Sequence, residues 1–234
     1  MRYMGGKCTA RGTISKHVLS HGLPVLEPFV GGANLPDLWP EGSVASDIVG
    51  SLIDLYEKVR VEGVDWLPDE VSEATYKELL ARFRAGKIQR PIDAFVLFGC
   101  SFGGKHGQGY ARSRSENFVA QAKNALRRLH GRPCRYVHRS FFDIPVSGGF
   151  ALYLDPPYYE TTAYKAREGT IRFDHGRFVK RAREWAEAGA PVYISEYRAL
   201  DRTWVDVDVT LIRGRVGLGI SNQPSRLFRV DLSR

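Results

Sequence analysis

The chain has 234 residues, of which 43% are hydrophobic and 12% aromatic, enough for one core of ordinary size and a smaller lobe. No apolar stretch approaches the roughly 20 residues of a membrane-spanning helix, and residues 1–7 contain no apolar run of the signal-peptide type. Three scattered cysteines, Cys8, Cys100 and Cys134, exclude a disulfide framework and a cysteine metal site, and they favour a reducing cytoplasm.

Positive charge is concentrated in one internal part of the chain. The formal net charge is +8, yet residues 82–139 hold 13 lysine and arginine side chains against two acids, a net charge of +11. The other residues carry a net charge of −3. Such segregation favours a polyanionic partner, and nucleic acid is the commonest one. A solvated basic surface without a partner is the simpler alternative.

Residues 1–62 show alternating helix and strand patterns. Apolar residues recur at helical spacing in the last of these elements, and adjacent glycines mark the turn after the first strand. The expected elements, in chain order, are a helix over 11–21, a strand over 24–29, a helix opened by 31–34, a strand over 43–47 and a helix over 48–61.

Residues 65–132 break this alternation and are expected to form a largely helical insertion. Helical or mixed patterns cover 70–83, 92–98 and 116–130, and a glycine-rich stretch over 99–110 separates the second from the third. The insertion lies between the second and third strands of the expected sheet. It also contains most of the excess positive charge.

The α/β pattern resumes after the insertion. We predict an α/β fold with a mostly parallel, Rossmann-like sheet, antiparallel C-terminal strands and the inserted helical lobe. The two parts of the main domain are 1–62 and 133–234, and the lobe is 63–132. The later elements are strands over 134–138, 150–154 and 191–195, a helix over 174–188 capped by Asp174, and closing strands over 205–213 and 226–232.

A proline-rich turn, Asp155-Pro156-Pro157-Tyr158, follows the apolar strand over 150–154. Ligands of such sheets bind where the strands end. The prolines stiffen the turn and leave its carbonyl groups free to accept hydrogen bonds. A fixed set of acceptors beside an aromatic ring suits an amino group on a planar base. A surface turn rich in proline is the alternative.

A second constellation is typical of a nucleoside cofactor. Glu27–Asn34 forms a strand-to-turn segment with adjacent glycines, which let the backbone approach a ligand closely. Asp47 ends the next strand, where an acid can bind the hydroxyl groups of a ribose. The GxGxxG motif is absent, and Gly5-Gly6-Lys7 lacks the spacing of a phosphate loop. A cofactor without phosphates therefore fits better than a dinucleotide or a nucleoside triphosphate.

The order of these motifs resembles that of the Dam-like (D12 class) DNA adenine methyltransferases, in particular phage and prophage members associated with DNA modification. The resemblance covers nearly the whole chain. It rests on Arg2–Lys7, Glu27–Gly32, Ser46-Asp47-Ile48, Cys100–Lys105 with Gly109–Arg112, Asp155–Tyr158, and Tyr159–Tyr164. Two segments depart from the family pattern: Ala33-Asn34 replaces a common third glycine, and Ser140 precedes Phe141 where an acid is more usual.

The resemblance implies S-adenosylmethionine as the cofactor and assigns residues to it. The part over 1–62 and 133–234 would then be the cofactor-binding catalytic domain, and 63–132 the target-recognition lobe. By position, the cofactor contacts would be Tyr3, Lys7, Phe29, Gly31, Asp47, Ile48, Phe141 and Asp155. In this assignment Asp47 holds the ribose, while Ile48 and Phe141 lie against the adenine.

The same resemblance implies a reaction on double-stranded DNA. The target adenine would leave the duplex, stack on Tyr158 and donate its amino hydrogens to Asp155 and the Pro156 carbonyl. Orientation and charge placement would then suffice for direct methyl transfer without a metal or a covalent intermediate. Phosphate or base contacts are expected from Lys105, Arg112 and Arg114. We expect a monomer in the cytoplasm, without a membrane partner.

Three other functions are compatible with parts of the sequence. Transfer to the 4-amino group of cytosine uses the same geometry. A methyltransferase acting on RNA or a protein amide is a second alternative, although the Tyr3–Lys7 segment argues against it. A non-catalytic nucleic-acid-binding module is the third, and the intact Asp155 and Tyr158 argue against it. We interpret Cys134 as a buried strand residue rather than as the nucleophile of cytosine C5 methylation.

Overall fold

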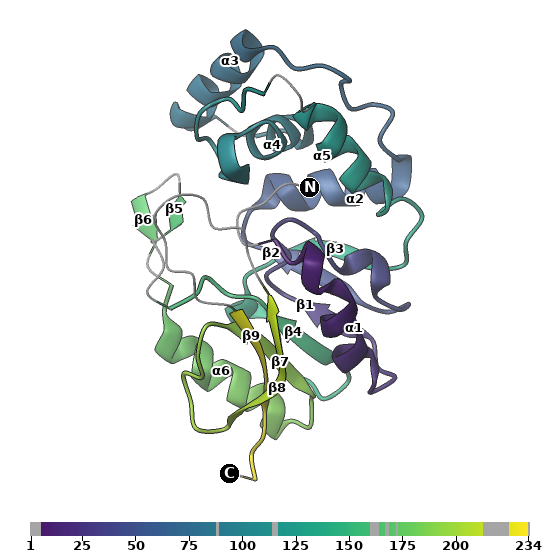
Figure 1. Cartoon of the computed structure of the whole chain (residues 1–234), viewed down its shortest axis with the longest axis vertical. Helices are drawn as coiled ribbons and strands as arrows, with labels where there is room; N and C mark the ends of the chain where they lie inside the picture. The colour runs from purple at the N-terminus through teal and green to yellow at the C-terminus, as the bar shows by residue number, and fades with distance from the viewer. Residues whose placement is uncertain are drawn as a thin grey trace.

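The computed structural model describes residues 6–87, 89–113, 117–159, 164–166, 169–171, 173–212 and 225–233. A seven-stranded sheet with the order β3-β2-β1-β4-β7-β9-β8 forms its centre (Figure 1). The strands are β1 (Val25–Glu27), β2 (Val44–Asp47), β3 (Arg135–His138), β4 (Ala151–Leu154), β7 (Val192–Glu196), β8 (Trp204–Ile212) and β9 (Ser225–Val230).

All strands of this sheet except β9 run in the same direction. β1 pairs in parallel with β2 and β4, and the parallel pairing continues to β3 on one side and to β7 on the other. β9 is antiparallel to both β7 and β8. β8 therefore has the same direction as the five parallel strands β3, β2, β1, β4 and β7. The mostly parallel, Rossmann-like α/β sheet with antiparallel C-terminal pairing is therefore confirmed, and this strand order is consistent with the methyltransferase type.

The central strands are buried on both faces, as expected of a parallel sheet covered by helices. Every residue of β1, β4 and β7 is buried. Alternate side chains belong to different clusters: Ala151 and Tyr153 join one, while Leu152 and Leu154 join the other. This period of two is the ordinary geometry of a strand, and it divides the core into two layers.

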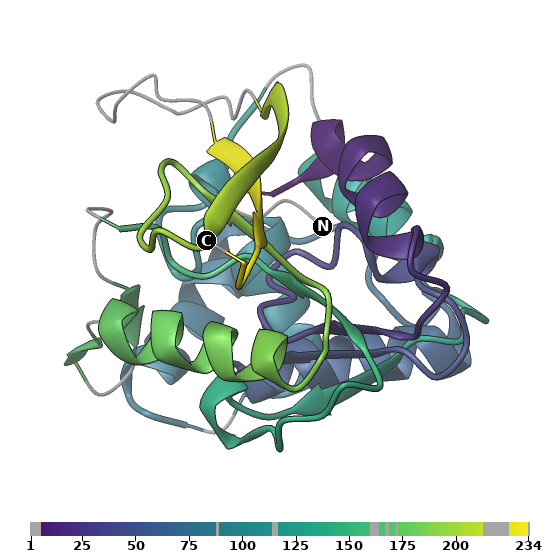
Figure 2. The same ribbon diagram turned by 90° about the horizontal axis from the view of Figure 1, so that it is seen from below.

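Helices cover both faces of the sheet. α1 (Arg11–Leu19) contributes Ile14 and Val18 to the cluster on one face, and α2 (Gly50–Glu62) packs into the same cluster. α6 (His175–Glu187) places Phe178, Ala182 and Trp185 against the other face. Figure 2 shows α1 and α6 on different sides of the strands. Asp174 accepts a hydrogen bond from the Arg177 amide, which confirms the expected cap of α6.

The inserted segment between β2 and β3 is helical, as expected. It contains α3 (Glu73–Arg84), α4 (Pro91–Gly99) and α5 (Phe118–Arg127), which lie together at one end of the molecule in Figure 1. α4 is buried from Asp93 to Gly99. Its apolar side chains belong to the same cluster as α2 and one face of the sheet, so the inserted helices share a core with the sheet.

Two local expectations were wrong or incomplete. No α-helix begins at Gly31–Asn34; a turn leads instead to a short 3-10 helix, η2 (Pro36–Leu38). Gly31 and Ala33 adopt positive φ values of 44° and 49°, which are incompatible with a right-handed helix. The sequence patterns also missed the antiparallel hairpin of β5 (Tyr164–Ala166) and β6 (Gly169–Ile171).

No helix in the described parts of the chain combines the length and apolar character needed to cross a bilayer.

Candidate active site

The Asp155–Tyr158 turn lies at the point where the strand order reverses. From β1 the chain builds outward to β2 and β3, and it then returns to place β4 on the other side of β1. Open α/β sheets bind ligands outside the carboxyl ends of their strands at such a switch point. The turns that follow β1 and β4 are therefore neighbours, which places the Glu27–Gly32 and Asp155–Tyr158 segments at one site.

Lys7 joins the N-terminal segment to this turn. Its ammonium nitrogen, Nζ, lies 2.6 Å from Asp155 Oδ2, and the two side chains are 6% and 19% exposed. The same nitrogen lies 5.0 Å from the centroid of the Tyr158 ring. An ammonium group is attracted both by a carboxylate and by the face of an aromatic ring. The predicted residues Lys7, Asp155 and Tyr158 thus meet at one point, although 148 positions separate the first two.

Burial controls the charge of Asp155. It raises the pKa of the carboxyl above its usual value, whereas the Lys7 ammonium and the Tyr158 hydroxyl act in the opposite direction. A desolvated carboxyl with one cationic partner is the kind of group that binds a hydrogen-bond donor strongly, since little water competes.

The turn itself is held from two further directions. His175 donates a hydrogen bond from Nε2 to the Pro157 carbonyl over 2.9 Å. Glu196, at the end of β7, accepts the Tyr159 amide over 3.0 Å. The two neighbouring prolines have no amide hydrogen to contribute, so these contacts from α6 and β7 fix the turn.

Two further carboxyl groups, those of Glu27 and Glu196, are influenced by Asp155. Glu27 is 3% exposed, and burial raises its pKa well above the usual value; the Asp155 charge contributes in the same direction. Trp39 donates to Glu27 Oε2 over 2.6 Å. Glu196 is fully buried, and burial together with Asp155 raises its pKa to about 7. The Asp155 charge thus acts on both Glu27 and Glu196, while Arg128 acts on Glu27 and Lys7 on Glu196.

Asp47 ties the turns after β1 and β2 together. Its two carboxylate oxygens accept the Gly31 and Val49 amides, each over 3.0 Å. Gly31 adopts a φ of 44°, which glycine reaches at low cost, and its carbonyl accepts the Tyr56 hydroxyl. Burial raises the pKa of Asp47 while these amides lower it. Its contact with a ribose stays a prediction.

The predicted aromatic contacts lie in a cluster beside the β1 turn. The half-buried Phe29 packs against Phe141, with ring centroids 5.4 Å apart. Phe141 is 1% exposed and also contacts Phe178 of α6. Ile48 is 58% exposed at the carboxyl end of β2. Phe29 and Ile48 therefore present more accessible surface than Phe141, and the cofactor contacts of all three stay predictions. Tyr3 lies outside the described residues.

The basic side chains of the insertion differ in their surroundings. Lys105 is exposed after the 3-10 helix η3 (Phe102–Gly104), and no ion pair involves it within the described part of the chain. Arg112 binds the two carboxylate oxygens of Glu73 over 2.6–2.9 Å. Arg114 lies outside the described residues. Of the three predicted nucleic-acid contacts, Lys105 is therefore the one described side chain whose charge is not balanced nearby.

Several other cations of the insertion serve the fold. Lys123 is 6% exposed and donates to the Leu67 carbonyl and to Asp69. Arg128 pairs with Asp37 and donates to the Ala33 carbonyl, so it anchors α5 to the β1 turn. The net charge of residues 82–139 therefore overstates the charge that is available to a polyanion.

Within the described part of the chain, the cysteines and potential metal ligands form no alternative site. Cys134 is fully buried before β3, and burial raises the pKa of its thiol well above the usual value. This confirms the interpretation as a buried residue, because a protonated thiol is a poor nucleophile. Among the described residues, no group of three or more histidine, cysteine or acidic side chains is arranged to hold a metal ion.

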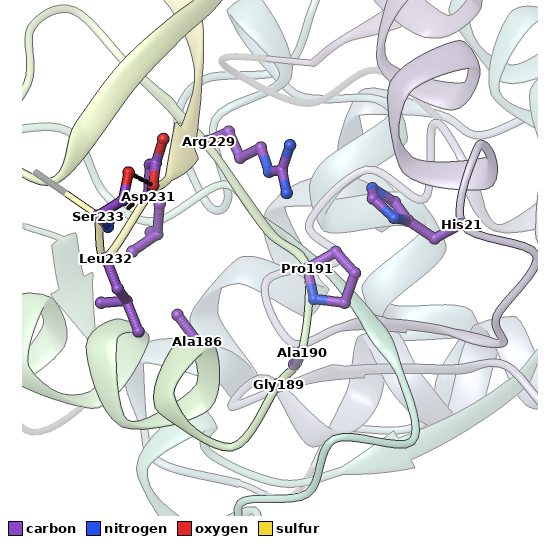
Figure 3. A pocket seen from close by; sticks show the side chains of 10 residues that line it. His21, Ala186, Gly189, Ala190, Pro191, Arg229, Asp231, Leu232 and Ser233 are labelled. Atoms are coloured by element: carbon purple, nitrogen blue, oxygen red, sulfur yellow. Dashed lines mark hydrogen bonds between the residues drawn. The ribbon is translucent and has the colours of Figure 1, made fainter.

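A pocket of about 330 Å³ lies where β7 begins and β9 ends (Figure 3). His21 and Arg229 face each other across it, and Pro191 forms its floor just before β7 begins. Asp155 follows the carboxyl end of a strand parallel to β7, so this pocket is at the wrong end of the strands to serve it. The titratable side chains described above lie around Asp155, at the carboxyl ends of the strands, and we place the candidate active site there.

Sequence patterns identify only part of the set of residues that hold this site. His175 follows the predicted cap Asp174 and Glu27 lies in the Glu27–Gly32 segment, and neither has an individual role in the sequence analysis. Glu196 directly follows the predicted strand over 191–195, where a pocket residue and a strand cap fit the sequence equally well. A polar residue directly after an apolar strand is the common signal for Glu27 and Glu196. The contact of His175 with the Pro157 carbonyl depends on tertiary packing and leaves no local pattern.

Comparisons with known proteins add little to this description. No family model matches the chain, and no curated protein matches it. Two solved structures of the rRNA methyltransferase AviRa from Streptomyces viridochromogenes are similar, with 18% and 15% sequence identity and TM-scores of 0.38 and 0.37. They cover 94% and 93% of this chain and 83% and 84% of theirs. Superpositions with such low scores support no inference about this chain, so the fold rests on the strand order alone.

Proposed function

We propose that this protein transfers a methyl group from S-adenosylmethionine to the 6-amino group of adenine in double-stranded DNA. One observation carries the proposal: the corner formed by Asp155 and Tyr158 already holds a primary amine, the Lys7 ammonium, 2.6 Å from the carboxylate and over the ring. The amino group of a base would donate a hydrogen bond to the same carboxyl group while its ring stacks on Tyr158.

The acidic character of the site fits the proposed cofactor. When bound, S-adenosylmethionine supplies a methyl group on a positively charged sulfur. The Asp155 charge raises the pKa of both Glu27 and Glu196, so a cationic ligand beside these carboxyl groups would relieve their repulsion. The residues that would hold it are Phe29, Gly31, Asp47 and Ile48, in the turns after β1 and β2.

The chemistry of the chain's own residues is then orientation and proton acceptance. Asp155 and the Pro156 carbonyl accept the two amino hydrogens, which directs the nitrogen lone pair out of the base plane toward the methyl donor. His175 and Glu196 keep the turn in place. Because burial raises its pKa, Asp155 is also suited to take up the proton that the methylated nitrogen releases.

Lys105→Ala is expected to weaken DNA binding and to reduce the slope of log affinity against log salt by about 0.9, the value for one phosphate contact. Arg112→Ala is expected to have a smaller effect, because Glu73 already balances its charge. Lys16→Ala, an exposed lysine on α1, is the control. Fluorescence anisotropy of a labelled duplex over a range of salt concentrations measures the slope. An unchanged slope in Lys105→Ala would place the DNA on another surface.

Phe102→Ala is expected to lower duplex affinity about tenfold without loss of stability. Phe102 is 70% exposed beside Lys105, and the bond from its amide to the Gly109 carbonyl fixes the turn that carries it. An aromatic ring presented in this way suits insertion between base pairs, and base stacking contributes about 1–3 kcal/mol. Val61→Ala, 61% exposed on α2, is the control. Equal affinities for both variants would remove Phe102 from the interface.

A panel of acceptors tests the proposed function. The protein is incubated with S-adenosylmethionine carrying a labelled methyl group and, separately, with unmodified duplex DNA, RNA and a mixture of proteins. Label in the duplex DNA fraction supports the proposal. Label only in RNA or protein would overturn it in favour of the alternative acceptors, and label in none would favour a binding module without transferase activity.

A further inference from the structure

Glu196 has an arrangement that strand capping does not explain. Its side chain is fully buried at the end of β7, and its two oxygens accept hydrogen bonds from different amides. Oε2 accepts the Tyr159 amide over 3.0 Å, and Oε1 accepts the Tyr197 amide over 2.7 Å. One carboxylate thus joins the turn after β4 to the turn after β7.

The two bonded amides belong to the segments that carry the aromatic walls of the site. Tyr158 directly precedes Tyr159, and its ring meets the Tyr197 ring edge-on with centroids 4.7 Å apart and planes at 84°. A displacement of one backbone segment relative to the other therefore changes the distance between the two rings. The Glu196 carboxylate is the polar link that holds this spacing.

Groups from several elements set the pKa of Glu196. Burial is the main cause of its pKa of about 7; Asp155 in the β4 turn raises the value further, whereas the two amides and Lys7 lower it. Tyr158 and Tyr197 face it as neutral phenols whose own pKa values are raised. Arg226 is its register partner on β9, but its guanidinium binds Asp206.

We propose that Glu196 is a positioning residue, which in its ionised form fixes the distance between Tyr158 and Tyr197 around the target base. The proposal rests on the function proposed above and goes beyond it by assigning the control of the base pocket to one carboxylate. As a positioning residue, Glu196 does not touch the substrate. It acts through the two backbone amides that it binds.

Protonation weakens this link for a simple chemical reason. The ionised carboxylate offers an acceptor oxygen to each amide, whereas the neutral form carries a hydrogen on one oxygen and accepts poorly there. Because the pKa in the fold exceeds the ordinary 4.5, ionisation lowers the free energy of unfolding as pH rises from about 4.5 through about 7. The folded protein is therefore less stable when Glu196 is ionised, and such a cost in stability is common at functional sites.

Glu196→Gln tests the role in catalysis, because the amide side chain keeps the shape but has one acceptor oxygen and no charge. At pH 8 we expect kcat/KM to fall by about tenfold to a hundredfold, the effect of displacing a binding group by about 1 Å. The rise in activity centred near pH 7 should disappear in this variant. Glu196→Asp should keep a pH-dependent profile with reduced activity, since it keeps the charge on a shorter side chain. Glu184→Gln on α6 is the matched control.

Amide exchange measured without substrate separates this proposal from the proposed function. In the wild-type protein, exchange of the Tyr159 and Tyr197 amides, corrected for intrinsic rates, should become slower as pH rises through about 7, and Glu196→Gln should abolish this change. If the protein methylates nothing but shows this exchange pattern, the proposed function fails and the positioning role stands. Wild-type activity and pH profile in Glu196→Gln, or a uniform loss of activity and protection throughout the sheet, would overturn the positioning role.

Discussion

Asp155→Asn is expected to lower the rate of methyl transfer by at least about 100-fold while nucleic-acid binding persists. The substitution preserves the shape of the side chain but removes a charged acceptor, and the amide hydrogens that it adds would face the amino group of the substrate. The loss of one preorganised hydrogen-bonding group in an active site typically costs about 100- to 1,000-fold in kcat. Single-turnover transfer and duplex anisotropy on the same preparation measure the two properties.

Asp206→Asn is the control for this experiment. Asp206 is a half-exposed acid on β8 that pairs with Arg226, so its replacement removes a carboxylate outside the proposed site. We expect transfer in Asp206→Asn to equal that of the wild-type protein. Retention of normal turnover by Asp155→Asn would contradict the role of the carboxylate, and a parallel loss of DNA binding would show that the substitution perturbs more than the chemical step.

Lys7→Met is expected to lower the free energy of unfolding by about 3 kcal/mol, because it leaves the Asp155 carboxylate buried without its cation. The same change should raise the pKa of Asp155 further, since Lys7 lowers it in the native protein. Because Lys7 lowers the pKa of both Asp155 and Glu196 in the native protein, the acidic limb of the pH–rate profile should move to higher pH. Urea unfolding and the pH dependence of transfer measure the two effects.

The double variant Lys7→Met, Asp155→Asn identifies the cause of this instability. If the unpaired carboxylate is responsible, the second substitution should restore most of the lost stability, since neither partner then carries a charge. Additive losses in the double variant would instead mean that Lys7 stabilises the N-terminal segment through its other contacts.

Residue patterns predicted the helices and strands that bury apolar side chains at the regular spacing of their secondary structure. The strand over 150–154 and the helix over 174–188 were located correctly, because their apolar periods and the Asp174 cap are local signals. The missing helix after β1 shows the limit of such signals. Adjacent glycines permit either a helix start or a left-handed turn, and the bond from the Gly31 amide to Asp47 selects the turn.

The site itself could be predicted in part. The motif order indicated Lys7 and Asp155 as site residues, but their direct contact joins positions 148 residues apart and depends on the complete fold. Charge counting also has a physical limit, since Lys123 and Arg128 bind Asp69 and Asp37, acids that precede the basic segment. The charge count over residues 82–139 leaves out these two acids, although in the folded protein they bind cations of that segment.

Mass spectrometry of the modified nucleosides distinguishes methylation of adenine from methylation of cytosine. Duplex DNA without prior modification is incubated with the protein and S-adenosylmethionine carrying a deuterated methyl group, digested to nucleosides and compared with an Asp155→Asn reaction. We expect deuterated 6-methyladenine from the wild-type protein and about 100-fold less from the variant. Deuterated 4-methylcytosine as the product, or equal amounts of 6-methyladenine from both proteins, would contradict it.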